Sequence, residues 1–197
     1  MSQTLEQTYQ LRFDELNALV QTFSDAEGFF ALSEEEAKRK FDECLFWFFV
    51  DGFESGILMT GLEIEMPNGY EYLDIKYPDG ETVEEKFRKY FSEQDEGRMR
   101  TLLESESHRM WNTGSLESIK ESGDIRDNSA VYVSDIKKTW LTMKDEKVRD
   151  THWMLEGQTI PANEEFVTAD GDYGMAPGMF QTAENNSNCR CILRYGR

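Results

Sequence analysis

The sequence is poor in cysteine, histidine and proline: its 197 residues include three cysteines, two histidines and four prolines. Three cysteines cannot form the paired disulfide framework of small secreted domains, so we expect reduced thiols in a reducing compartment. Two histidines leave little material for a catalytic site that depends on imidazole. These shortages exclude a disulfide scaffold and make histidine-rich chemistry a weak hypothesis.

The sequence also lacks a long hydrophobic run. The longest is Leu45–Val50, whereas a membrane-spanning helix needs about 20 apolar residues. The opening stretch MSQTLEQTYQLRFDEL carries acidic and polar residues where a signal peptide needs a basic start and an apolar stretch. We therefore expect a soluble protein that is made in the cytoplasm and does not enter a membrane.

Positive charge is scarce, since 21 Lys and Arg stand against 39 Asp and Glu, for a formal net charge of −18. Residues 1–100 hold 23 of the acids and 10 of the bases. Such a surface repels phosphate, so neither non-specific nor direct sequence-specific nucleic-acid binding is expected. A solvated acidic face or a basic protein partner explains the charge better. The 39% hydrophobic content is enough for one domain, or a small domain with an appended helical region.

Apolar spacing predicts helices in the first half of the chain. A first helix is expected over residues 4–24, and the capping box of Ser33 and Glu36 should start a second helix that ends near Phe53. The second helix carries the aromatic run Phe46, Trp47, Phe48 and Phe49. An apolar surface on every side indicates either a central core helix or a helix covered by a partner.

The pattern changes to alternation over residues 62–77, around the turn Pro67-Asn68-Gly69, which predicts a β-hairpin. A short third helix should follow Thr82, and a long fourth helix is expected over residues 97–122. Glu106 lies on the apolar side of that long helix. Its carboxylate needs a partner there, and Arg109 is the nearest candidate.

Beyond residue 124 the sequence indicates short strands and long loops. Residues 131–133 and 139–143 have strand composition, and Asp145 can cap a short helix through residue 155. Residues 157–188 should be loops, and Cys189–Tyr195 a closing strand. The predicted fold class is α+β: a helical N-terminal region with a β-hairpin, then a long helix packed on a small C-terminal sheet with extended loops.

Two enzyme signatures are missing from the sequence. It contains neither a strand–G-x-x-x-x-G-K-S/T–helix phosphate loop nor a G-x-S-x-G elbow. A nucleophilic pair of His152 with Cys189 or Cys191 is conceivable, but nothing in the sequence places these residues in contact.

The same residues suit a metal site. Cys189 and Cys191 are two residues apart in a predicted strand, so both thiols should project to one side. Together with His152 they would supply three ligands of a tetrahedral zinc site, with His108 or Asp145 as the fourth. The alternative is structural: the cysteines are small buried residues, and Asp145, Arg149, His152 and Asn188 form a hydrogen-bond network that fixes residues 157–188.

The last third of the chain holds an ordered set of residues. The set comprises Trp140, then Asp145, Val148, Arg149 and His152 as D-x-x-V-R-x-x-H, then Gly157, Gln158, Ile160 and Pro161, then Phe166, Pro177-Gly178 and Asn188-Cys189-Arg190-Cys191. It resembles the head morphogenesis (Mu F-like) family of tailed bacteriophages. Upstream, Glu106, Arg109 and Asn112 are similar to that family's T-E-x-x-R-x-x-N helix, with Ser105 in place of Thr. The resemblance covers roughly residues 78–193.

The resemblance implies a minor head (minor capsid) protein, a structural component of the virion that is made in the host cytoplasm and located in the head at the portal vertex. It implies binding to the portal protein or the major capsid protein, a role in head assembly or DNA delivery, and compatibility with a homo-oligomer in the virion. It implies neither catalysis nor a cofactor, and the zinc hypothesis above rests on the three residues themselves.

The resemblance also divides the chain into a docking region, residues 1–77, and a Mu F-like domain, residues 78–197. Phe46, Trp47 and Phe49 are the docking candidates in the first region. Domains that resemble this one occur fused to, or are related to, nuclease-like and ADP-ribosyltransferase-like phage effectors, so an enzyme is the alternative. It would need His108, Arg149 and His152 in one open cleft. A zinc-stabilised adaptor module is a third hypothesis.

Overall fold

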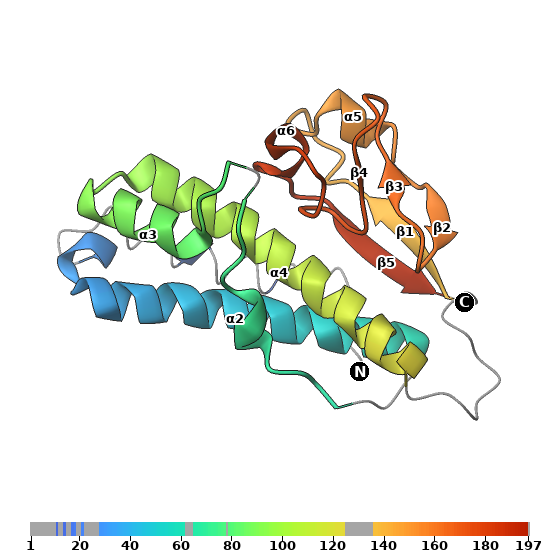
Figure 1. Cartoon of the computed structure of the whole chain (residues 1–197), viewed down its shortest axis with the longest axis horizontal. Helices are drawn as coiled ribbons and strands as arrows, with labels where there is room; N and C mark the ends of the chain where they lie inside the picture. Colours follow the sequence, from blue (N-terminus) through green and yellow to red (C-terminus); the bar gives the residue numbers. More distant parts are fainter. Residues whose placement is uncertain are drawn as a thin grey trace.

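The computed structural model describes residues 28–61, 65–77, 79–124 and 136–196, with scattered positions between residues 11 and 21. Two long helices, α2 (Glu34–Thr60) and α4 (Glu96–Asp124), lie side by side, and a smaller lobe of short strands and loops sits against them (Figure 1). The fold class is α+β, as predicted. The helix predicted over residues 4–24 and the strand predicted over 131–133 lie mostly or wholly outside the described residues.

Helix α2 begins where the capping box predicts. The Ser33 side chain accepts a hydrogen bond from the Glu36 amide at 3.3 Å, and three glutamates in the first turn complement the positive end of the helix. The helix continues past the predicted end at Phe53 to Thr60. It stops at Gly61, whose φ of 69° suits glycine and whose N–H donates to the Ile57 carbonyl at 2.8 Å.

Small residues let α2 and α4 approach each other closely. A Cβ atom at Gly52 would lie 2.1 Å from the Trp111 carbonyl oxygen, and one at Gly114 would lie 2.1 Å from that of Phe49. The Ser115 hydroxyl donates to the Gly52 carbonyl at 2.9 Å. The two backbones therefore touch at this crossing, without room for a side chain on either glycine.

A first core cluster fills the space between α2, α3 (Val83–Ser92) and α4. Helix α3 starts at a capping box in which Thr82 and Glu85 bond each other's backbone amides. The largest members of the cluster are Phe29, Phe41, Phe48, Phe49, Phe53, Phe87, Trp111 and, from the last strand, Ile192. The cluster draws on both sides of position 77, so the division into residues 1–77 and 78–197 stays a prediction.

The predicted β-hairpin is wrong. Residues 62–64 lie outside the described part, and Gly69–Tyr72 form a 3-10 helix, η2. Asn68 caps this helix by accepting from the Tyr70 amide at 3.3 Å, and the Tyr70 ring stacks on Phe46 with centroids 4.4 Å apart. The Tyr72 carbonyl, which a hairpin would use, accepts instead from the Arg109 guanidinium at 3.0 Å. Contacts with α2 and α4 therefore override the alternating pattern.

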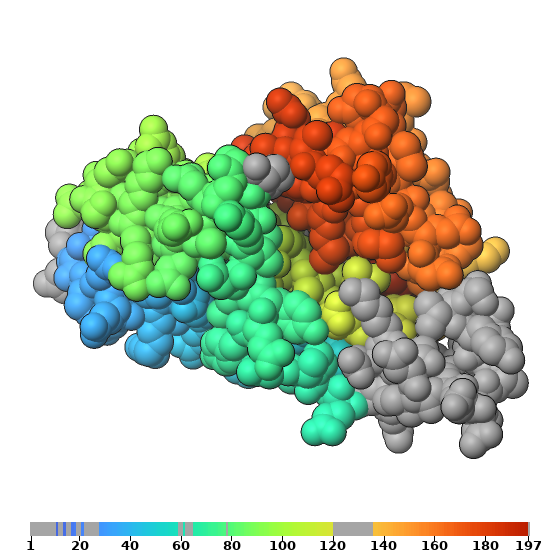
Figure 2. Space-filling model, viewed as in Figure 1, coloured from blue at the N-terminus to red at the C-terminus, as the bar shows by residue number. Residues whose placement is uncertain are grey.

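The C-terminal lobe is built on a three-stranded antiparallel sheet in the order β2-β1-β5. Strand β1 (Lys137–Leu141) lies between β2 (Thr159–Pro161) and β5 (Ile192–Gly196), and β3 (Phe166–Val167) pairs separately with β4 (Tyr173–Gly174). A second core cluster, which includes Trp140, Phe166, Phe180, Leu193 and Tyr195, lies under the sheet. Figure 2 shows the lobe and the helical part as two masses, with the C-terminal half of α4, in yellow, visible between them.

Two short helices, α5 (Asp150–Trp153) and α6 (Ala183–Asn186), complete the lobe. The helix predicted over 145–155 is therefore much shorter, because Asp145 does not cap it. The Asp145 carboxylate accepts from the Lys147 amide within a turn and pairs with Arg190. None of the described helices is apolar over a length that would cross a membrane.

Candidate functional site

The predicted ion pair on α4 is present and buried. Arg109 Nε donates to Glu106 Oε2 at 2.6 Å, and the Tyr77 hydroxyl donates to Glu106 Oε1 at 2.5 Å. Burial, followed by the adjacent Glu106 charge, raises the pKa of Tyr77 above its usual value, so this phenol remains a donor. The group joins α4 to the segment that ends at Tyr77.

Asn112, one turn further along α4, holds the start of strand β5. Its amide nitrogen donates to the Cys191 carbonyl at 3.1 Å, and its oxygen accepts from the Leu193 amide at 3.2 Å. In the segment before β5, the Asn188 amide donates to Ser105 Oγ at 3.0 Å. The T-E-x-x-R-x-x-N-like face of α4 is thus the surface to which residues 188–193 are attached.

Polar contacts with Arg149 and Asp145 also hold the segment 184–191 in place. Arg149 donates to the carbonyls of Glu184 and Ser187, and Arg190 pairs with Asp145 at 2.7 Å. The hydrogen bond from Arg190 lowers the pKa of the Asp145 carboxyl. The predicted side-chain network of Asp145, Arg149, His152 and Asn188 is therefore wrong in its partners. The side chains of Asp145, Arg149 and His152 contact the 184–191 segment, and the Asn188 amide binds α4.

The structure brings His152, Cys189 and Cys191 together. The Cys189 and Cys191 sulfurs lie 3.5 Å and 3.7 Å from His152 Nδ1, and the three ligand atoms lie within 4.8 Å of one another. All three residues are buried, at most 4% exposed. The hydrogen bond from Cys191, with help from His152, lowers the pKa of the Cys189 thiol, while the same bond and burial raise that of Cys191. We call this group the Cys2His cluster.

The surroundings of the cluster are partly aromatic and partly charged. The His152 ring packs against Trp140 and Phe180, with centroids 5.2 Å and 5.5 Å away. On the other side is a hollow of about 10 Å³, lined by the cluster and by residues that include Arg149 and Asn188. A hollow of this size has room for about one water molecule or one ion.

The two predicted fourth ligands do not join the Cys2His cluster. Asp145 is engaged with Arg190, and neither it nor His108 belongs to the group of mutually close ligand atoms found among the described residues. His108 is 1% exposed and does not line the hollow that Arg149 and His152 share. The open cleft that the enzyme hypothesis requires from His108, Arg149 and His152 is thus not formed.

His108 should make stability depend on pH. Burial, and then the positive charge of Arg190, lower its pKa to about 3, whereas an unfolded chain has a histidine pKa of about 6.5. Below pH 6.5 the unfolded state binds a proton that the folded state refuses, so stability falls as pH falls toward 3. We expect a loss of roughly 2 kcal/mol between pH 7.5 and pH 5 from this residue. Urea unfolding of the wild type and of His108→Gln at several pH values measures it.

The expected result is a weaker pH dependence in His108→Gln, because all other groups are common to both proteins. Equal slopes for the two proteins would contradict the assignment.

The remaining signature residues of the lobe serve packing and chain direction. Gly157 has φ 74°, and its N–H donates to the Trp140 carbonyl at 2.9 Å. The Trp140 N–H in turn donates to the Gln158 carbonyl at 3.0 Å, and Pro161 stands opposite Lys137 in the sheet. Phe166 is fully buried against Trp140, with centroids 5.1 Å apart. These residues shape the sheet, and Trp140 on that sheet packs against His152 of the Cys2His cluster.

The sequence did not lead us to Asp172, whose carboxylate is the centre of the hydrogen bonds within the loops. Its carboxylate accepts from the Gln181 and Thr182 amides at 3.0 Å and 3.1 Å and from the Asn185 side chain at 3.0 Å. Burial alone would raise its pKa, but hydrogen bonds, led by those from Thr182 and Asn185, lower it to about 2. The stretch Asp170-Gly171-Asp172 was a usable signal, since aspartate commonly binds nearby backbone amides in turns.

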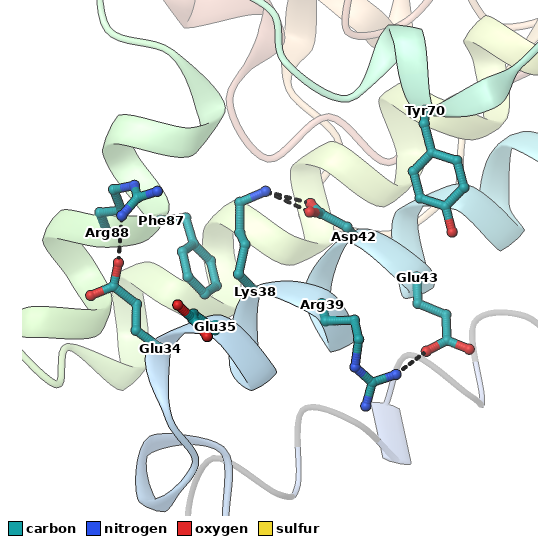
Figure 3. Close-up of a pocket in the computed structure, with 9 residues that line it drawn as sticks. All are labelled: Glu34, Glu35, Lys38, Arg39, Asp42, Glu43, Tyr70, Phe87 and Arg88. Carbon is teal, nitrogen blue, oxygen red and sulfur yellow. Dashed lines mark hydrogen bonds and ion pairs between the residues drawn. The ribbon is translucent and has the colours of Figure 1, made fainter.

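A larger hollow of about 600 Å³ lies between α2, α3 and η2 (Figure 3). Its three basic side chains each form an ion pair: Lys38 with Asp42 at 2.6 Å, Arg39 with Glu43 at 3.4 Å, and Arg88 with Glu34 at 2.8 Å. Because its basic side chains are paired with carboxylates, the hollow offers a solvated surface rather than a set of catalytic groups.

The docking candidates on α2 differ in accessibility. Phe49 is fully buried in the first core cluster, so the docking prediction is wrong for this residue. Trp47 is 44% exposed, and Phe46 is half-buried beneath Tyr70, which is 50% exposed. We call Phe46, Trp47 and Tyr70 the α2 aromatic patch.

The chain belongs to the Phage Mu protein F like family, whose model matches residues 78–194. Over 96 residues it is 30% identical to the minor head protein GP7 of Bacillus phage SPP1, covering 49% of this chain and 29% of GP7. Over 57 residues it is 42% identical to the NAD(+)--arginine ADP-ribosyltransferase EFV of Enterococcus faecalis, covering 29% of this chain and 12% of EFV. No solved structure matches the chain significantly.

Proposed function

We propose that this protein is a structural minor head protein of a tailed phage, which binds the portal protein or the major capsid protein in the virion head and assists head assembly or DNA delivery. The observation that carries the proposal is the family match over residues 78–194, together with the alignment to GP7. The chain spans 29% of GP7, so the partner and the stage of assembly belong to the proposal.

The distribution of charge supports a protein partner. The net charge is −18, and the paired charges around the hollow of α2 and α3 leave no basic surface there for a phosphate backbone. An acidic surface of this kind is complementary to basic patches on another protein. Such complementarity raises the association rate and helps to select the partner. We assign the docking contact to the α2 aromatic patch, because exposed aromatic residues commonly supply the energetic centre of an interface.

The enzyme alternative is not favoured. Both histidines are 1% exposed, and Arg149 is occupied by two backbone carbonyls. The alignment to the ADP-ribosyltransferase EFV covers 12% of that protein, so the activity that its name describes is not assigned to this chain.

The test is capture of the portal protein and, separately, of the major capsid protein encoded by the same phage, using the full chain as bait. Deleting residues 1–75 is unsuitable, because α2 contributes much of the first core cluster. A point variant, Trp47→Glu, removes the centre of the α2 aromatic patch instead. Trp153→Glu is the matched control, since Trp153 is 41% exposed and lies on α5 in the other lobe.

We expect the wild type and Trp153→Glu to capture the same partner, and Trp47→Glu to lose at least about tenfold in affinity, as for an interface hot spot. Equal capture by both variants would remove the docking assignment. Absence of the protein from purified phage heads, together with no capture of either partner, would overturn the proposed function.

A further inference from the structure

We propose that His152, Cys189 and Cys191 bind a zinc ion, through His152 Nδ1 and the two cysteine sulfurs. The ion would link helix α5 to the segment that leads into strand β5. The proposal concerns the residues of the lobe alone and does not depend on what the protein binds in the phage head.

The two separations between nitrogen and sulfur fit the edges of a zinc tetrahedron. With Zn–S bonds of about 2.3 Å and Zn–N bonds of about 2.0–2.1 Å, tetrahedral angles place nitrogen and sulfur about 3.5–3.6 Å apart. The observed separations are 3.5 Å for Cys189 and 3.7 Å for Cys191. The two sulfurs lie within 4.8 Å of each other, and a zinc tetrahedron would place them about 3.8 Å apart. An ion can therefore enter between the three atoms if the sulfurs move by no more than about 1 Å.

The chemistry of the cluster also suits zinc. Two thiolates balance the charge of Zn²⁺, so a neutral group would occupy this buried site once the two thiol protons have passed to solvent. Sulfur and imidazole ligands select zinc over calcium or magnesium, which prefer oxygen. The hollow of about 10 Å³ beside the cluster leaves space for a water molecule as the fourth ligand.

The position of the ligands explains what the ion would do. Residues 184–191 contain little that is apolar, and Arg149, Arg190 and Ser105 attach them by polar contacts. A metal bridge from α5 would add a strong link to these contacts. It would stabilise the lobe that carries most of the family signature, without supplying a catalytic group.

The competing explanation is a thiol–imidazole contact without metal. Cys189 and Cys191 would then act as buried residues that hydrogen-bond with His152. Oxidation of the two thiols to a disulfide is a further possibility, which a reductant in the buffer removes.

The experiment uses the full chain, stripped of metal under reducing conditions and titrated with Zn²⁺ and with Co²⁺. We expect one metal ion per chain and, with Co²⁺, the thiolate charge-transfer band and intense visible bands of a tetrahedral site. Saturating zinc should raise the melting temperature by roughly 5–10 °C. Cys44→Ser is the matched control, since Cys44 is the third cysteine and lies on α2, away from the cluster.

We expect Cys44→Ser to bind metal like the wild type, and Cys189→Ser and Cys191→Ser each to lose at least about tenfold in affinity. Alkylation of the wild type followed by peptide mapping covers the case in which these variants do not fold: zinc should protect Cys189 and Cys191 selectively. No metal uptake by the reduced wild type, or uptake without protection of these cysteines, overturns the proposal.

Discussion

Alanine in place of Gly114 is expected to lower the free energy of unfolding by about 3 kcal/mol or more. The added Cβ would lie 2.1 Å from the Phe49 carbonyl oxygen and 2.9 Å from the Phe53 backbone nitrogen. Both are backbone atoms of α2, so no side-chain rotation relieves the overlap and the helices must separate. Separation would open the first core cluster, which both helices share.

Gly97 provides the control on the same helix. It is exposed, and a Cβ there would come no nearer than 3.7 Å to Asp95 Oδ1. Gly97→Ala should therefore be neutral, or stabilising by up to about 1 kcal/mol from helix propensity. Urea unfolding of the two variants compares them, and a difference below about 1 kcal/mol would contradict close helix contact at Gly114.

Gly52 on α2, which faces α4 at the same crossing, provides a second test of the close helix contact. Gly52→Ala meets the Trp111 carbonyl oxygen at 2.1 Å and should be similarly destabilising. The two losses should not add, because helices already separated by one substitution accept the second more easily. The double variant is thus expected to be less destabilised than the sum of the single variants.

Removing the buried charge of Glu106 is the second change with a large expected effect. Glu106→Gln leaves the Arg109 cation, 6% exposed, without its carboxylate, which should cost about 3–5 kcal/mol. Glu43→Gln breaks a comparable pair with Arg39 at 3.4 Å on the surface, where both side chains are more than half exposed. That control should change stability by less than about 1 kcal/mol.

A local measurement separates this effect from general weakening. Arg109 also donates to the Tyr72 carbonyl at 3.0 Å, and Glu106 orients Arg109 for this bond. Hydrogen exchange of residues 69–73 should therefore accelerate in Glu106→Gln more than that of α3. Replacing both charges, as in Glu106→Leu with Arg109→Met, should restore part of the lost stability, because no unpaired charge is left buried. Similar stability of the two Glu106 variants would count against the buried-charge argument.

The parts of the fold that the sequence predicts are those set by local chemistry. The capping box predicted at Ser33 and the cap predicted at Thr82 mark helix starts that the structure confirms. The pairing of Glu106 with Arg109 follows from their spacing on one helix. In each case the interacting groups lie within a turn of each other.

The failures come from contacts between distant segments. The alternation around Asn68 indicated strands, but stacking on Phe46 and the hydrogen bond from Arg109 favoured a 3-10 helix. Asp145 was expected to cap a helix and to join a network with Arg149, His152 and Asn188, yet its side chain pairs with Arg190. The sequence showed that Cys189 and Cys191 share a side, but only the tertiary fold brings His152 to them from 37 residues away.

Strand β5 has a consequence for how the protein is made. Its residue Ile192 enters the first core cluster, whereas Leu193 and Tyr195 enter the second, and Asn112 holds its backbone. Every element that β5 joins precedes it in the chain, so a ribosome has already released α2, α4 and β1 before this strand appears. At about 5–20 residues per second, translation takes several seconds to pass from β1 to β5, and both core clusters lack this strand during that time. During that interval apolar surfaces of both core clusters are accessible to chaperones, and β5 covers part of each cluster when it arrives.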